Sequence, residues 1–175
     1  MIQLAKKYFK IYRSITGLGV RKSLKLLKSE IPNLKIKKIK SGTKVFDWVV
    51  PPEWKIKDAY IIDNDNKKII DFKKNNLHVV SYSKNINKVI TKKELSKHLF
   101  FLKNKPNSIP YVTSYYKRTW GFCLNYNHFK KKFNSNKYKV VIKSSFDKSG
   151  FLNYGELIIK GKTDKEILIH TYICH

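Results

Sequence analysis

The sequence has little sulfur and no long apolar segment. Its 175 residues include 2 cysteines, too few for a disulfide-stapled mini-protein and in keeping with a reducing compartment. No apolar run reaches the roughly 18–20 residues that a membrane helix needs. The first residues also lack the apolar core of a signal peptide. We therefore expect a soluble, cytoplasmic protein without a membrane partner.

Several catalytic motifs are missing as well. The sequence contains no glycine-rich dinucleotide or phosphate loop, no C-x-x-C pair, no H-E-x-x-H helix and no G-x-S-x-G elbow. None of its few acidic residues is spaced as a pair of catalytic carboxylates. Taken alone, the residues predict a soluble protein that mixes helices and strands, and they leave its function open.

Charge, by contrast, is strongly of one sign. Lysine and arginine total 38 against 12 acidic residues, which gives a formal net charge of +26. Such an excess is typical of proteins that bind nucleic acid. However, only Arg13, Arg21 and Arg118 are arginines, the residue that base readout and phosphate clamps favour. Lysine, isoleucine and asparagine share A/T-rich codons, so we expect genome bias and scattered lysines, and we rank a nucleic-acid partner last.

Apolar spacing predicts the first elements. Residues 2–15 and 20–31 each carry an apolar stripe with helical period. Residues 59–62 and 69–72 flank an Asp-Asn-Asp-Asn turn and predict a β-hairpin.

Further along, capping and apolar runs predict three more elements. Thr91 precedes Glu94 by three positions, the spacing of a capping box that opens a helix. A helix is expected over residues 126–133. The apolar run over residues 167–174 predicts a buried strand.

The predicted last strand places His175 at its C-terminal end. In α/β folds functional side chains gather at this end of the strands, and a histidine there suits metal binding or general-base chemistry. His170 lies five positions earlier, and an odd separation on a strand puts it on the opposite face. The two histidines are therefore not expected to share a metal.

Seven blocks along the chain resemble one known family. In order they read RSITG at 13–17, SGTKVFDWVVPPEW at 41–54, NLHVVSYS at 76–83, IPYVTSYY at 109–116, WGFCL at 120–124, YGE at 154–156 and TYICH at 171–175. Together they resemble the bacterial polysaccharide-biosynthesis proteins with an aminopeptidase-like domain.

This resemblance implies an α/β plus β fold. A partial zinc-aminopeptidase-like α/β domain would be interrupted by an inserted β-rich domain of unknown function. Residues 1–42 and 114–175 would belong to the peptidase-like domain, and residues 43–113 to the insert. The chain resembles only the N-terminal part of the family, truncated after His175.

The resemblance also implies a metal. It carries the superfamily's first zinc ligand onto His175, and so implies zinc in the complete protein. The remaining ligands and the general-base glutamate have no counterpart here. We therefore expect no catalytic residue, no zinc held by this chain alone and no hydrolysis by it. In the complete protein the substrate would be a peptide or an amino-acyl- or sugar-linked compound.

Two groups of side chains are candidates for substrate binding. Trp48 and Trp54 flank a Pro-Pro step, and with Tyr60 and Tyr82 they form either a platform for a sugar or peptide or the core of the insert. Tyr115, Arg118 and Trp120 either grip a substrate carboxylate or tie two domains together. A β-rich module that binds a glycan or peptide is therefore the alternative to a peptidase-like protein.

Overall fold

The structure is a computed structural model that describes residues 2–173. Its helices are α1 (Ile2–Phe9), α2 (Leu18–Glu30), α3 (Lys92–Ser96), α4 (Tyr126–Lys132) and the 3₁₀ turn η1 (Asn76–His78). Its strands are β1 (Lys35–Lys40), β2 (Lys44–Val45), β3 (Trp48–Val49), β4 (Glu53–Ile62), β5 (Lys68–Asp71), β6 (Ile86–Thr91), β7 (Leu99–Phe100), β8 (Phe122–Cys123), β9 (Lys137–Asp147) and β10 (Phe151–Glu156). These elements form two compact units, unit 1 up to Glu53 and from Asp147 onward, and unit 2 from Trp54 to Phe146.

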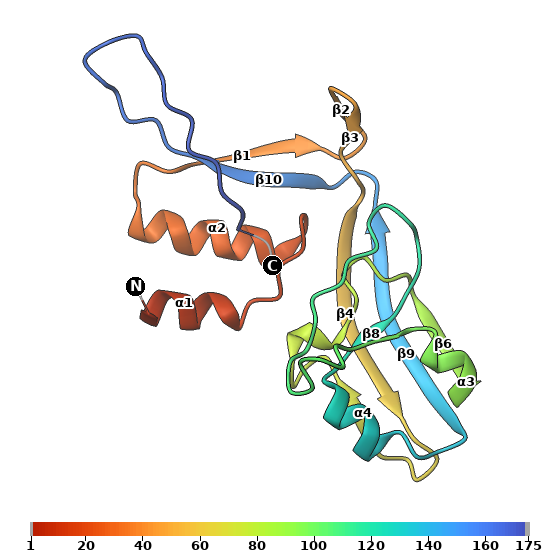
Figure 1. The fold of residues 1–175 in the computed structure, drawn as a ribbon. Helices are drawn as coiled ribbons and strands as arrows, with labels where there is room; N and C mark the ends of the chain where they lie inside the picture. The colour runs from red at the N-terminus through yellow and green to blue at the C-terminus, as the bar shows by residue number, and fades with distance from the viewer. Residues whose placement is uncertain (1, 174–175) are drawn as a thin grey trace. The chain divides into compact units, whose positions relative to one another are not determined.

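Unit 1 is built on a ribbon of two antiparallel strands, β1 and β10, with α2 packed against it and α1 beside α2 (Figure 1). Ile36 lies opposite Gly155 in this ribbon. A Cβ on Gly155 would lie 3.2 Å from side-chain carbons of Leu24 and Leu34, so the missing side chain lets these leucines pack closely on the strand. Val20 and Leu24 are buried, and they are the apolar positions of α2 that face this core.

Unit 2 is built on a four-stranded sheet with the order β5-β4-β9-β6. The β4–β5 hairpin predicted from the sequence is present, with Ile61 opposite Ile70 and the turn between them. The core of the unit includes Ala59, Ile61, Val140 and Ile142, each with no exposed area. A separate parallel pair joins β7 to β8. The chain thus mixes helices with several small sheets, as the sequence predicts.

The edges of unit 2 differ from the predicted region 43–113. Gly42 and Pro110 mark loops within a unit, and Gly42 has a φ of 87° in the turn before β2. Unit 2 runs on to Phe146 because β9 lies between β4 and β6 in its sheet. Residues 114–146, which the sequence assigned to the last region, therefore pack with unit 2.

The predicted strand over residues 167–174 is wrong for the part that the structure describes. Residues 157–173 form no helix or strand. The side chains of Ile167, Leu168 and Ile169 are 91%, 91% and 88% exposed. A strand needs a neighbour to pair its N–H and C=O groups, and no described strand pairs with this segment. Cys174 and His175 lie outside the described residues. Within residues 2–173, no helix is long and apolar enough to cross a membrane.

Candidate functional site

Aromatic rings and one guanidinium gather in unit 2 around Tyr82. The Tyr82 ring stacks on Trp54 at 5.8 Å between centroids and meets Tyr115 at 5.9 Å and Phe146 at 6.0 Å. Arg118 places its Cζ 4.8 Å from the centre of the Phe146 ring. We call these residues, together with Tyr116, the Tyr82 cluster.

A turn at residues 80–83 positions Tyr82. Tyr82 has a φ of 64°, in the left-handed region that bulky residues rarely adopt. The Ser83 hydroxyl donates to the Val80 carbonyl at 2.6 Å, which closes the turn. The Ser83 carbonyl accepts from Trp54 Nε1 at 2.9 Å and from the Ser144 hydroxyl at 2.7 Å. These bonds tie the turn to β4 and β9, so the unusual backbone conformation is held from several sides.

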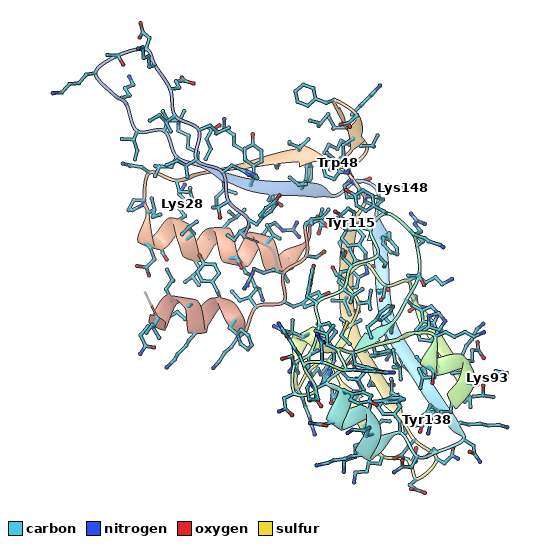
Figure 2. The ribbon with its side chains drawn as sticks, viewed as in Figure 1. Lys28, Trp48, Lys93, Tyr115, Tyr138 and Lys148 are labelled. Atoms are coloured by element: carbon cyan, nitrogen blue, oxygen red, sulfur yellow. The ribbon has the colours of Figure 1, made fainter. Side chains whose placement is uncertain are left out.

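Backbone bonds place the segment that carries Tyr115 beside this turn. Ser81 N–H donates to the Val112 carbonyl, and Ser114 N–H donates to the Ser81 carbonyl, both at 2.9 Å. Tyr115, labelled in Figure 2, follows directly and is half-buried.

The outer part of the Tyr82 cluster is open to solvent. Tyr116 is 81% exposed, and its ring lies 4.1 Å from that of Tyr115. Arg118 is exposed as well. A guanidinium beside flat rings binds a carboxylate through paired N–H donors while the rings cover the apolar part of the ligand. The arrangement therefore suits a small molecule or chain end that carries a carboxylate.

The three tryptophans singled out in the sequence lie in three different environments. Trp54 is 3% exposed and packs in the core of unit 2. Trp120 is 6% exposed and stacks on His98 at 3.7 Å, and its carbonyl is 3.0 Å from His98 Nδ1. Trp48 is half-exposed on β3 in unit 1. Of these three, only Trp48 thus offers part of its ring to a ligand.

Phe146 of the Tyr82 cluster, and His98 outside it, carry no functional signal in the sequence. Phe146 is an ordinary alternating residue of β9, and His98, which covers Trp120, follows a short helix. Their partners come from distant segments, so only the tertiary structure brings them together.

The described part of the chain lacks the side-chain cluster that a metal site needs. Among residues 2–173, no three His, Cys, Asp or Glu side chains lie close enough together to hold an ion. Cys123 is fully buried, and burial raises the pKa of its thiol to about 12, so the thiolate that binds metals is not formed at neutral pH. The residues present therefore do not fit a zinc site, and His175 lies outside the described part of the chain.

Two neighbouring histidines in unit 2 are kept neutral. The His78 ring lies edge-on to the His128 ring at 6.3 Å, and His78 Nδ1 donates to the Cys123 carbonyl at 2.7 Å. Burial lowers the pKa of His78, and the bond to Cys123 only partly offsets this. Burial also lowers the pKa of His128, and the charge of Lys132 adds to that effect.

The histidine pair predicts acid sensitivity of unit 2. Above the ordinary histidine pKa of about 6.5, both rings are neutral in the folded and unfolded states, so these two residues contribute no pH dependence to the free energy of unfolding. Below it the unfolded chain takes up protons that the folded unit does not, and stability falls by about 1.4 kcal/mol for each unit by which a pKa is lowered. Urea unfolding between pH 8 and pH 5 should show this decline.

Histidine variants test whether His78 and His128 cause the acid sensitivity. Changing both residues, His78→Gln and His128→Gln, should flatten the decline below pH 6.5, whereas the exposed His170→Gln should leave it unchanged. An equal slope in the double variant and the wild type would assign the acid sensitivity to other groups.

One known protein family matches the residues that form unit 2. The family model described as "Domain of unknown function (DUF2172)" matches residues 53–145, just over half of the chain. The chain belongs to the DUF2172 family. The DUF2172 match and unit 2, residues 54–146, have the same bounds to within one residue.

Two relatives are similar to this chain over unit 1 as well as over the DUF2172 match. A Clostridium acetobutylicum protein described as "Putative polysaccharide biosynthesis protein with aminopeptidase-like domain" is 50% identical over 98% of this chain. A crystal structure described as that of a "putative peptidase" from Clostridium acetobutylicum is also 50% identical and has a TM-score of 0.82 over 87% of this chain. This chain spans 39% of the length of the first relative and 36% of the length of the second.

Proposed function

We propose that this chain is part of an aminopeptidase-like protein of polysaccharide biosynthesis and that unit 2 binds a substrate without cleaving it. The observation that carries the proposal is the 50% identity to the Clostridium relative over nearly the whole chain. In this proposal unit 1 belongs to the peptidase-like α/β domain, and unit 2 is the inserted β-rich domain. The agreement between unit 2 and the DUF2172 match supports this division.

Hydrolysis is not assigned to this chain. Zinc is an expectation for the complete protein, with His175 as one ligand, but the described residues do not fit a zinc site. A catalytic zinc needs about three protein ligands and an open position. We therefore propose that residues 2–173 contribute binding and positioning.

A hydrolysis assay tests the proposed division of labour. The purified chain should release no product from leucine p-nitroanilide above the protein-free rate, with or without added zinc, because residues 2–173 offer no set of metal ligands. Zinc-dependent release that His175→Ala abolishes and His170→Ala preserves would show a working metal site and overturn the proposal for this chain.

The Tyr82 cluster is our proposed binding site. The part of the cluster that is open to solvent contains the exposed Tyr116 ring and the exposed Arg118 guanidinium. A peptide or an amino-acyl compound with a free carboxylate matches this chemistry, and so does an acidic sugar. The buried Trp54 ring supports Tyr82 by stacking on it, whereas the buried Trp120 ring stacks on His98 outside the cluster.

Calorimetry with a matched pair of ligands tests the role of Arg118. The dipeptide Gly-Tyr should bind about fivefold or more tightly than its C-terminal amide, because a charge-assisted pair contributes about 1 kcal/mol or more at a partly covered site. Arg118→Gln should remove the difference between the two ligands, while Lys143→Gln, an exposed cation on β9, should preserve it. Equal affinity of wild-type protein for both ligands would refute carboxylate recognition.

A further inference from the structure

A long stretch of unit 2 contains no carboxylate side chain. Between Glu94 and Asp147 every charged side chain is cationic and exposed: Lys97, Lys103, Lys105, Lys117, Arg118, Lys130, Lys131, Lys132, Lys137, Lys139 and Lys143. All 12 acidic residues lie in the rest of the chain.

Codon bias accounts for the lysines but not for the missing acids. Aspartate and glutamate have the codons GAT and GAA, which an A/T-rich genome also favours. The same genome supplies acidic residues before residue 95 and after residue 146. Codon bias therefore does not explain their absence between these positions, and without them this stretch has no carboxylate that would repel an anionic partner.

Five of these lysines lie on two neighbouring segments of unit 2, residues 101–107 and helix α4. The segment 101–107 lies along α4, since Asn127 N–H donates to the Pro106 carbonyl at 3.1 Å and Asn127 Nδ2 donates to Asn107 Oδ1 at 2.7 Å. The Phe101 ring packs between the two segments, 4.8 Å from Phe129 and 5.2 Å from Tyr126. We call this region the α4 surface; its charged members are Lys103, Lys105, Lys130, Lys131 and Lys132.

Two aspartates lie at one side of the α4 surface. Asp63 and Asp65 belong to the β4–β5 turn, where Asn64 N–H donates to the Ser135 hydroxyl at 3.4 Å. The Asp63 carboxylate already accepts from the N–H groups of Asp65 at 3.1 Å and Lys67 at 2.8 Å. These acids therefore serve their own turn and do not pair with the five lysines.

We propose that the α4 surface binds an acidic polysaccharide, a proposal that rests on the polysaccharide link of the proposed function. Spaced ammonium groups match the carboxylates that recur along an acidic sugar chain. Asparagine amides at Asn104, Asn107 and Asn127 offer the donors and acceptors that sugar hydroxyls need. The half-buried rings of Phe101, Tyr126 and Phe129 pack against one another and hold segment 101–107 on α4, which fixes the positions of the backbone that carries these groups.

Nucleic acid fits the α4 surface less well. None of its five cations is an arginine, the residue that pairs with phosphate through two parallel bonds. Single-stranded nucleic acid needs open ring faces on which bases stack. Here Lys130 Nζ lies over the Tyr126 ring at 5.0 Å, and the Phe101 and Phe129 rings stack on each other.

Binding of polygalacturonate to the full chain tests the proposal, with dextran as the uncharged sugar and oligothymidylate as the nucleic acid. Changing Lys130, Lys131 and Lys132 to glutamine should weaken polygalacturonate binding about tenfold or more, with a shallower salt dependence, because three cation contacts are lost. The matched control changes Lys88, Lys92 and Lys93 (Lys93 is labelled on α3 in Figure 2) to glutamine. It removes the same charge from unit 2 and should change affinity less than about twofold.

Three results would overturn the proposal. Equal weakening by both triple variants would show diffuse charge attraction. Tighter binding of oligothymidylate than of polygalacturonate would identify a nucleic-acid surface. A wild-type chain that does not bind polygalacturonate would leave no polysaccharide site. None of these results changes the outcome of the hydrolysis assay, so the two proposals fail separately.

Discussion

Replacing Arg21 by alanine is expected to lower the free energy of unfolding of unit 1 by about 2–3 kcal/mol, because Glu53 is buried while Arg21 is partly open to solvent. Arg21 on α2 holds the Glu53 carboxylate through two bonds, Nη1 to Oε2 at 2.8 Å and Nη2 to Oε1 at 2.7 Å. Glu53 is 3% exposed, and its Oε2 also accepts from Phe151 N–H at 3.2 Å. The bond to Glu53 raises the pKa of Arg21, which is therefore charged at every accessible pH. Alanine would leave a buried carboxylate without the cation that compensates its lost hydration.

A second ion pair in the same unit provides the control. Lys37 contacts Glu156 at 2.6 Å across the β1–β10 ribbon, but both side chains reach solvent. Lys37→Ala should therefore cost far less than Arg21→Ala. Arg21→Lys should fall between them, because an ammonium keeps the charge but not the paired geometry. Hydrogen exchange of the β1 and β10 amides reports on unit 1, and equal loss of protection in the alanine variants would show that Glu53 is not held as described.

Local patterns in the sequence predicted the elements that local bonds stabilise. Thr91 caps α3 as the spacing to Glu94 predicts, with the Glu94 N–H donating to Thr91 Oγ1 at 3.2 Å. The turn between β4 and β5 closes because the Asp63 side chain accepts from two N–H groups of that turn. Helix α4 lies within the predicted residues 126–133. In each case the atoms that stabilise the element are a few positions apart in the chain.

Elements that depend on distant partners were less predictable. The apolar run from residue 167 has the composition of a buried strand, yet its described part has no neighbour to pair with and remains exposed. Trp54 could serve a platform or a core, and its burial depends on a hydrogen bond to Ser83, far along the chain. The Tyr82 cluster likewise combines β4, the turn at 80–83, the segment around Tyr115 and β9. Sequence spacing within any one of these segments carries no information about the others.

Gly19→Ala is expected to destabilise unit 1 by about 3 kcal/mol or more, although alanine normally stabilises a helix by about 1 kcal/mol relative to glycine. Gly19 lies in the first turn of α2. A Cβ at this position would lie 1.7 Å from the Tyr12 carbonyl oxygen, 2.8 Å from its carbon and 3.3 Å from Arg13 Cα. These are backbone atoms, so no side-chain rotation relieves the clash. The segment 12–13 would have to move away from the helix.

Whether Gly19→Ala lowers or raises the free energy of unfolding of unit 1 distinguishes a packing role of Gly19 from an ordinary glycine in a helix. If Gly19 made no close contact, alanine would stabilise α2 through its higher helix propensity and so stabilise the unit. Gly161→Ala is the matched control, because its new Cβ would meet no atom closer than 3.8 Å and should leave stability unchanged. Urea unfolding with hydrogen exchange on α2 measures both variants. A Gly19→Ala protein as stable as the wild type would mean that the Tyr12 backbone does not pack against α2, whereas the expected loss would show that the close approach of these two segments requires a residue without a side chain.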